Sequence, residues 1–232
     1  MTSAIILAAG QGTRLRPLTE KTHKSLLTIN KEPFLERTIK FLIAEKVEEI
    51  IIVTGYLNQQ FEYLAEKFKE VRLVFNDKYV ELNNAYSLYI VRDFLADSYI
   101  LEGDLFIKES VFKDISTDTS NYFVKRLDTT KEEWLVTTDL NSKIVDIRVG
   151  QVCGSDYISA GITYLNDADG HTLKNVFEGL DFVSLSPNLY WDTILKNNLE
   201  NLNVYVKIIP ENLVYEIDDL EDYKSLLEEF NE

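Results

Sequence analysis

The chain has 232 residues, of which 45% are hydrophobic, a length that suits one large α/β domain or at most two small ones. Its 24 basic and 39 acidic residues give a formal net charge of −15, which makes nucleic acid and anionic membranes poor partners. No apolar run approaches the roughly 18 residues that cross a bilayer, and the first residues lack a secretory signal pattern. The single cysteine excludes an internal disulfide, and two histidines leave little room for a zinc site. We therefore expect a cytoplasmic protein that binds neither nucleic acid nor membrane.

The first half of the chain alternates predicted strands with predicted helices. Strands are predicted over Ala4–Ala8, Glu49–Val53, Val71–Phe75 and Ser98–Leu101, and helices over Pro33–Leu42, Leu57–Phe68 and Tyr86–Leu95. This alternation predicts an α/β fold, a Rossmann-like doubly wound sheet that is mixed but mostly parallel. In such sheets ligands bind beyond the carboxyl ends of the strands, so the polar stretches after Ala8, Phe75 and Leu101 are candidate site segments.

From about Tyr122 the pattern is richer in strands. They are predicted over Tyr122–Lys125, Trp134–Thr138, Ile144–Val149, Tyr157–Leu165 and Val204–Ile209, and helices over Asp167–Phe177, Tyr190–Leu195 and Leu220–Phe230. No Pro/Gly/Ser-rich linker and no internal repeat separates the two patterns. We therefore predict a single domain over residues 1–232, with a smaller β-rich part after about residue 120.

A glycine-rich stretch follows the first predicted strand, with Gly10 and Gly12. Glycines let the backbone approach a ligand closely and aim N–H groups at an anion, but a structural turn explains them equally well. A dinucleotide fingerprint would need a third glycine where Leu15 stands, and a Walker A loop would need Gly-Lys-Ser/Thr, which is missing. The remaining pattern is Gly-x-Gly-x-Arg, followed by Lys24.

Basic residues gather in this same segment of an acidic chain: Arg14, Arg16, Lys21 and Lys24 stand against Glu20 alone. An arginine fork binds phosphate oxygens in pairs, and a lysine supplies a movable point charge. Charge alone leaves a solvated basic loop as an equally good explanation.

Acidic residues follow two of the predicted strands. Asp104 comes after Leu101, and Glu216 and Asp218 follow the strand near the C-terminus. The i, i+2 spacing places Glu216 and Asp218 on one face of an extended segment, and magnesium prefers a few carboxylates together with phosphate oxygens. In a chain with 39 acidic residues, ordinary solvent-exposed charges are the alternative.

The stretch from Leu7 to Thr19, Leu-Ala-Ala-Gly-x-Gly-x-Arg-Leu-x-Pro-Leu-Thr, followed by Lys24, resembles the signature of the nucleotidyltransferase superfamily. The resemblance implies a nucleotide-diphospho-sugar transferase type of fold, with a nucleotide-binding half over about 1–120 and an acceptor-binding half over about 121–232. It implies that Arg14 and Lys24 are catalytic and hold phosphates. His23 departs from the pattern, because many members have proline there.

The resemblance also implies the remaining site residues. Magnesium would be held by Asp104, Glu216 and Asp218. The nucleotide would be bound by Leu7, Ala8, Ala9, Gly10, Gln11, Gly12, Thr13, Arg14, Lys24, Tyr79, Asn84, Ser87 and Gly103.

A closer likeness, over essentially the whole chain, is to the bacterial choline-phosphate cytidylyltransferases. It rests on stretches such as Asn83–Leu88, Leu189–Asp192 and Tyr215–Asp218. The implied reaction transfers CMP from CTP to choline phosphate, giving CDP-choline and pyrophosphate. The implied partners are CTP and a small phosphorylated acceptor, with a homodimer as an open possibility.

A quaternary ammonium needs aromatic faces and a carboxylate, and the candidates are Trp134, Tyr190, Trp191 and Asp192. Core packing is the ordinary role of such aromatic residues. Ala85 stands where the choline type has an aromatic residue, and Asn188 where it has aspartate, so ethanolamine phosphate, glycerol phosphate or another phosphorylated acceptor stays open.

Two further alternatives belong to other classes. A sugar-1-phosphate nucleotidyltransferase usually has a different loop where this chain has Asn83 to Ser87. A non-catalytic nucleotide-binding regulatory subunit typically loses Arg14, Lys24 or a metal aspartate, and this chain keeps all of them.

Overall fold

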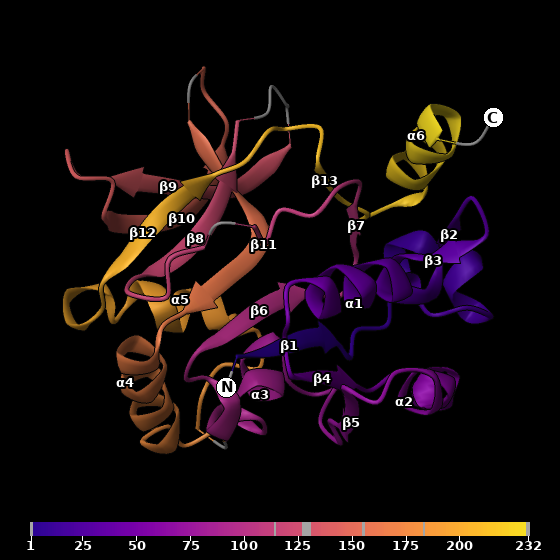
Figure 1. Ribbon diagram of the computed structural model, residues 1–232, viewed down its shortest axis with the longest axis horizontal. Helices are drawn as coiled ribbons and strands as arrows, with labels where there is room; N and C mark the ends of the chain where they lie inside the picture. The colour runs from indigo at the N-terminus through magenta and orange to yellow at the C-terminus, as the bar shows by residue number, and fades with distance from the viewer. Residues whose placement is uncertain (1, 114, 127–130, 155, 183, 231–232) are drawn as a thin grey trace.

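The computed structural model describes residues 2–113, 115–126, 131–154, 156–182 and 184–230, and they fold around one mixed sheet (Figure 1). Its main strand order is β10-β9-β11-β6-β1-β4-β5, and β8 pairs with β11 and β12. The strands are β1 (Ser3–Ala8), β4 (Glu49–Thr54), β5 (Val71–Phe75), β6 (Ser98–Glu102), β8 (Ser120–Lys125), β9 (Glu132–Thr138), β10 (Ile144–Gln151), β11 (Tyr157–Leu165) and β12 (Val204–Ile208). The predicted fold class is confirmed.

The first half of the sheet is parallel. β1 lies between β4 and β6 and runs parallel to both, and β5 runs parallel to β4. Every residue of β1 is buried, and alternate side chains enter different cores: Ile6 packs with α1 (Phe34–Ala44) and α2 (Glu62–Lys67), whereas Ile5 packs with α3 (Asn84–Tyr89), α4 (Asp167–Glu178) and α5 (Trp191–Lys196). Burial on both faces explains why these strands are continuous apolar runs.

The second half of the sheet is mainly antiparallel and joins the first through β11. This strand pairs antiparallel with β6, β8 and β9, and Ile162 lies opposite Leu101 of β6. Its register with β8 shifts between Ser159 and Thr163, around Gly161, whose φ is +70°. The sheet is therefore continuous across the boundary predicted near residue 120.

Two predicted helices are shorter than expected. Leu57 has a left-handed φ of 50° and precedes a 3-10 turn over Asn58–Phe61, so α2 begins only at Glu62. The side chain of Asn83 caps the start of α3, which ends at Tyr89 before a 3-10 turn over Arg92–Phe94. Apolar spacing continues through such turns, so it does not reveal where a helix stops.

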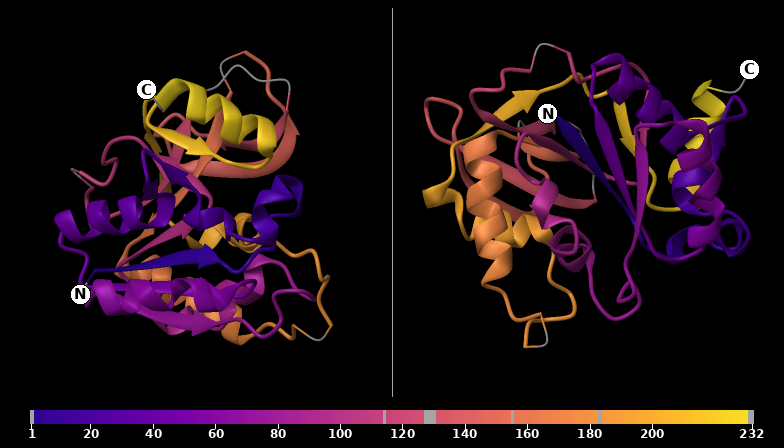
Figure 2. Two further views of the ribbon diagram at one scale, coloured as in Figure 1. Left: turned by 90° about the vertical axis from the view of Figure 1, so that its right-hand side faces the viewer. Right: turned by 60° about the horizontal axis from the view of Figure 1, so that its bottom comes forward.

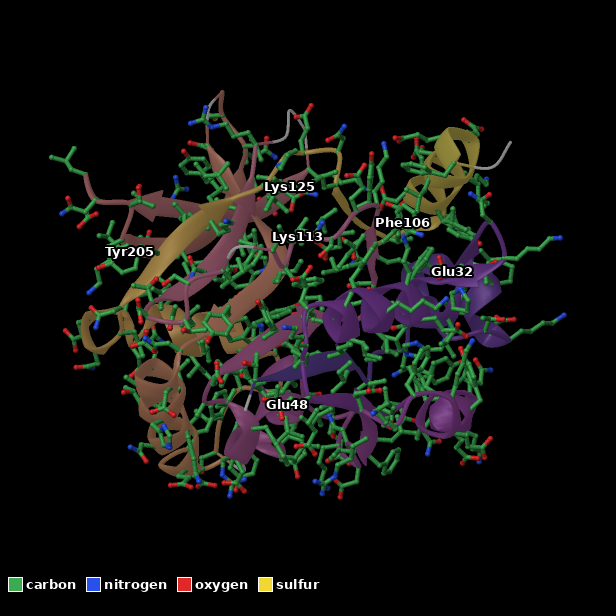
Figure 3. The ribbon with its side chains drawn as sticks, in the orientation of Figure 1. Glu32, Glu48, Phe106, Lys113, Lys125 and Tyr205 are labelled. Carbon is green, nitrogen blue, oxygen red and sulfur yellow. The ribbon has the colours of Figure 1, made fainter. Side chains whose placement is uncertain are left out.

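Two short strand pairs were not predicted: β2 (Thr28–Ile29) with β3 (Glu32–Pro33), and β7 (Leu105–Ile107) with β13 (Val214–Glu216). Phe106 of β7 lies between α1 and α6 (Leu220–Phe230), with its ring centroid 5.7 Å from that of Phe34 and 5.2 Å from that of Phe230 (Figure 3). α6 lies across the molecule from α4 (Figures 1 and 2). No helix within the described residues has the length and apolarity needed to span a membrane.

Candidate active site

A pocket of about 280 Å³ opens at the carboxyl ends of β1 and β6, where the sequence predicted ligand binding. Both halves of the chain form its walls. Of the predicted site residues, those that line it are Leu7, Ala9, Gly10, Arg14, Lys24, Tyr79, Asn84, Ser87, Asp104, Trp134, Tyr190, Trp191, Asp192, Glu216 and Asp218.

The other predicted residues lie beside the pocket and not in its lining: Ala8, Gln11, Gly12, Thr13 and Gly103. Ala8 is fully buried in the core that contains α1. The Gly103 N–H donates to the Leu7 carbonyl at 3.0 Å, and a Cβ at position 103 would lie only 2.6 Å from that oxygen. Gly103 thus allows β6 to end tightly against β1, so that Asp104 enters the pocket.

The glycine loop after β1 presents unpaired donors. Gly12 has a left-handed φ of +59°, and its carbonyl accepts a hydrogen bond from Thr19 Oγ1 at 2.8 Å. Within the described part of the chain, the backbone N–H groups of Gly10, Gln11 and Gly12 donate no hydrogen bond. Free N–H groups at the mouth of a pocket are suited to bind an anion such as a phosphate.

Two basic side chains of the loop segment pair with the predicted metal ligands. Lys24 Nζ donates to Asp104, and Arg14 Nη2 lies 2.5 Å from Asp218 Oδ1. Burial alone would lower the pKa of Lys24, but Asp104 and other carboxylates nearby outweigh it and raise the pKa, so Lys24 is a cation at neutral pH.

The three predicted metal ligands come together. One oxygen from each of Asp104, Glu216 and Asp218 lies within 4.8 Å of the others. The β7–β13 pairing brings them close, because Glu216 lies opposite Leu105 and the Ile217 N–H donates to the Asp104 carbonyl at 3.1 Å. The residues fit a magnesium ion, because Asp104 Oδ1 is buried and has no hydrogen-bond partner among the described residues.

Electrostatics point to the same fit. Glu216 is exposed as a residue, but the protein atoms around its carboxyl group limit hydration, and together with the negative charges of Asp104 and Asp218 this raises the pKa of Glu216 well above its ordinary value. Burial and the negative charge of Asp104 raise the pKa of Asp218, although Arg14 and Lys24 oppose this shift. Three carboxylates this close together repel one another, so a divalent cation between them would stabilise the form in which all three are ionised.

A polar network lines one side of the pocket. Asn84 Nδ2 donates to Glu102 Oε1 at 3.0 Å, and the Trp191 N–H donates to Asn84 Oδ1 at 3.0 Å, so one amide joins α3 to α5. The Tyr122 hydroxyl donates to Asp192 Oδ1 at 2.7 Å. Burial and the nearby Asp104 raise the pKa of Glu102 to about 8, and burial raises the pKa of Asp192 to about 6.

An aromatic wall lies at one side of the pocket. The rings of Trp134 and Tyr190 have centroids 5.6 Å apart and meet at 68°, edge to face. Tyr190 is 41% exposed, whereas Trp191 is 4% exposed and belongs mainly to the core that contains α5. Trp134 and Tyr190 are therefore the aromatic residues best placed to meet a ligand.

The two departures from the choline type lie outside the pocket lining. Ala85 is 1% exposed and packs in the core with Leu88. Asn188 is exposed, in the segment that precedes α5.

Part of the lining was not predicted as site residues: Asn76, Leu82, Asn83, Ile100, Glu102, Tyr122, Glu133, Ser159, Gly161, Ile162 and Thr163. Some of these had a detectable signal. Asn76 and Glu102 begin the polar stretches after Phe75 and Leu101 that were expected near a ligand, and Gly161 interrupts a predicted strand, which is typical of a bulge. The others reach the pocket through strand register and loop packing, which leave no local pattern.

A doubly wound sheet that presents N–H donors, two cations and a carboxylate trio at its ligand-binding edge is suited to bind the phosphates of a nucleotide, and this defines the class of protein. Residues 3–138 match the Nucleotidyl transferase family, and the chain belongs to this family, as the motif predicted. It is therefore an enzyme of the nucleotidyltransferase type.

Particular relatives resemble it over nearly the whole chain. It is 42% identical to the choline-phosphate cytidylyltransferase of Streptococcus pneumoniae over 97% of this chain and 96% of that one. It is 33% identical to the 2-aminoethylphosphonate cytidylyltransferase of Lancefieldella rimae, over 94% and 89% of the two chains. The solved structure of the CTP:phosphocholine cytidylyltransferase from Streptococcus pneumoniae matches with a TM-score of 0.91 at 39% identity, over 98% of this chain and 99% of that one.

Proposed function

We propose that this chain is a CTP:phosphocholine cytidylyltransferase, which transfers CMP from CTP to choline phosphate and releases pyrophosphate. One observation carries the proposal: the phosphate-binding loop with Lys24, the aromatic wall of Trp134 and Tyr190, and the Asp192 carboxyl all line a single pocket. The similarity to cytidylyltransferases over nearly the whole chain supports CTP as the nucleotide.

The nucleotide phosphates would lie along the glycine loop. The free N–H groups of Gly10 to Gly12 are donors for phosphate oxygens, and Arg14, whose side chain is 67% exposed, can turn from Asp218 to the β- and γ-phosphates. Tyr79 and the paired side chains of Asn76 and Ser87 line the same pocket and would bound the nucleoside.

In the proposed reaction, an oxygen of the acceptor phosphate forms a bond to the α-phosphorus of CTP. The bond from that phosphorus to the oxygen bridging to the β-phosphate breaks, and pyrophosphate leaves with the bonding electrons. No proton needs to move, because the attacking phosphate oxygen is already anionic. Lys24 would bind the α-phosphate and the acceptor phosphate together, which lowers their repulsion and stabilises the added charge.

We propose that Asp104, Glu216 and Asp218 hold a magnesium ion. When bound, the ion would offset the negative charge of the triphosphate. Chelation with EDTA should stop turnover, and Asp104→Asn should raise the magnesium concentration that is needed for half-maximal rate. Equal rates in EDTA and in magnesium would contradict the metal assignment.

The acceptor headgroup would lie against the aromatic wall. A trimethylammonium group cannot donate hydrogen bonds, so it gains most from aromatic faces and from a carboxylate at short range, here Trp134, Tyr190 and Asp192. A primary ammonium would gain more from hydrogen bonds to a carboxylate such as Asp192. The similarity to a 2-aminoethylphosphonate cytidylyltransferase makes a primary amine the second candidate acceptor.

A pyrophosphate-release screen tests the proposal. It combines CTP, UTP, GTP and dTTP with choline phosphate, ethanolamine phosphate, 2-aminoethylphosphonate, glycerol phosphate and glucose 1-phosphate. We expect CTP with choline phosphate to give the highest kcat/KM. A preference for UTP or dTTP with glucose 1-phosphate would instead indicate a sugar nucleotidyltransferase. If the protein binds CTP but releases no pyrophosphate with any of the acceptors, it would be a non-catalytic subunit.

A further inference from the structure

His23 is fully buried directly before Lys24 and bridges two segments of the site. Its ring Nε2 lies 3.0 Å from the Gly10 carbonyl oxygen, and its Nδ1 accepts the Ser25 N–H at 3.1 Å. The second contact caps the 3-10 turn Lys24–Leu26, which Lys24 begins. One imidazole therefore connects the glycine loop to the backbone that carries Lys24.

The surroundings of the ring determine its protonation. Burial, together with the adjacent Lys24 charge, lowers the pKa of His23 to about 4, so the ring is neutral at neutral pH. Because Nδ1 accepts from a backbone N–H, the proton of the neutral ring must be on Nε2, which then donates to the Gly10 carbonyl. The edge-to-face contact with Phe61, at 4.8 Å between centroids, holds the ring plane.

The backbone of residue 23 is held as well. The His23 N–H donates to Gln60 Oε1 at 2.9 Å, and Gln60 Nε2 donates to the Lys21 carbonyl at 2.8 Å. The backbone of His23 is thus held by the 3-10 turn Asn58–Phe61, and its imidazole in turn holds the glycine loop through the Gly10 carbonyl. A proline at this position could supply neither the backbone donor nor the ring donor.

We propose that His23 is a positioning residue for nucleotide binding: its Nε2–H fixes the Gly10 carbonyl and so orients the glycine loop relative to Lys24. In a trans peptide the carbonyl and the next N–H point in opposite directions, so this hydrogen bond also directs the Gln11 N–H away from the ring. That N–H is one of the loop donors without a partner among the described residues. The proposal rests on the proposed function only in that the loop binds nucleotide phosphates.

Two substitutions separate the two hydrogen bonds of the ring. The side-chain oxygen of His23→Asn can replace Nδ1 and keep the cap on Ser25, but no atom reaches the Gly10 carbonyl. The amide nitrogen of His23→Gln can replace Nε2 and keep the bond to Gly10, while the cap is lost. His171→Asn, at the exposed second histidine, is the matched control.

Dissociation constants and KM values are measured for the nucleoside triphosphate that the wild type turns over. The test of His23 therefore stays valid even if the acceptor is not choline phosphate. We expect His23→Asn to weaken nucleotide binding about fivefold or more, the loss typical of one hydrogen bond, with the acceptor KM unchanged. His23→Gln should stay within about twofold of wild type, despite a similar loss of thermal stability. Equal nucleotide affinity in both variants, or an equal loss in both, would overturn the proposal.

A second measurement needs no substrate and is independent of the proposed function. With only two histidines in the chain, the ¹⁵N imidazole signals of His23 follow from comparison with His171→Asn. The proposal requires a neutral ring protonated on Nε2 at pH 7. A ring protonated on Nδ1, or a charged ring, would show that the donor to Gly10 does not exist and would overturn the proposal even in a fully active enzyme.

Discussion

The Lys24 ammonium group has two possible partners, a carboxylate and the nucleotide phosphates, and it cannot pair fully with both. It pairs with Asp104, which belongs to the carboxylate trio, and it points into the pocket where the phosphates would bind. Without nucleotide the ammonium would compete with the proposed metal ion for Asp104. With nucleotide it can move to the phosphates and release that carboxylate.

Lys24→Ala should therefore have two opposite effects. Turnover should fall about 10²-fold or more, because the transition state loses a stabilising charge. Binding of Mn²⁺ to the nucleotide-free protein, measured by electron paramagnetic resonance, should tighten about tenfold or more, because Asp104 loses its competing cation. Half of the wild-type kcat, or weaker Mn²⁺ binding, would contradict these roles, and Lys31→Ala on an exposed turn is the control.

His23 also predicts a pH dependence of stability. Burial lowers its pKa from 6.5 in the unfolded chain to about 4 in the folded protein, so between these values the unfolded state binds more protons. The stability contributed by the neutral ring is present above about pH 6.5 and is lost as the pH falls toward 4. At pH 5 the loss is on the order of 2 kcal/mol.

Urea unfolding at pH 7 and pH 5 checks this value. Other groups also titrate in this range, so the quantity to compare is the pH-dependent change in the free energy of unfolding between wild type and His23→Gln. The variant should show a smaller change by about 2 kcal/mol. Equal changes in the two proteins would show that His23 is not buried as a neutral ring.

At the scale of elements, β9 supplies Trp134 of the aromatic wall, and the segment before α5 supplies Tyr190. Trp134 of β9 and Tyr190 are far apart in sequence, and their contact exists only because β9 and α5 border the same pocket. A desolvated cation–π contact contributes up to about 2 kcal/mol, or roughly thirtyfold in affinity.

Trp134→Ala should therefore raise the KM for choline phosphate by up to about thirtyfold, with little change in the KM for CTP. Steady-state kinetics with each substrate varied in turn gives both values. Exposed Leu140→Ala, beyond the end of β9, is a control for general damage to this part of the sheet. A parallel rise in both KM values would mean that Trp134 supports the fold and does not bind the acceptor.

At the scale of the molecule, the two halves share one sheet and the apolar cores on both of its faces. β11 of the second half covers the edge of β6, and a single apolar core contains Ile5 and Leu88 from the first half with Ile194 and Val204 from the second. Neither half can bury these side chains alone. The site depends on the same union, because Asp104 and Glu216 come from different halves.

We therefore expect the chain to unfold in one cooperative transition. Differential scanning calorimetry should give equal calorimetric and van't Hoff enthalpies, and a fragment of residues 1–120 should not fold, because the apolar edge of β6 would lose its neighbour. Two resolved transitions, or a folded fragment with the native circular dichroism of its strands, would indicate two domains.

Local sequence signals were enough to predict the family, the parallel half of the sheet and the glycine-rich loop at the pocket. Each of these rests on local signals: β-branched apolar runs for β1 and β4, and the contiguous motif from Leu7 to Thr19 with Lys24. Such features can be predicted from a short segment because they depend on the backbone geometry and burial of that segment alone.

Which distant residues meet could be seen only in the folded chain. β7 and β13 have three residues each, too few to show a period, yet their register brings Glu216 to Asp104. The structure also placed Glu102 within the pocket lining and left Ala85 and Asn188 outside it. The physical reason is that strand register and packing between segments about 100 residues apart depend on the whole core, and no local window of sequence contains that information.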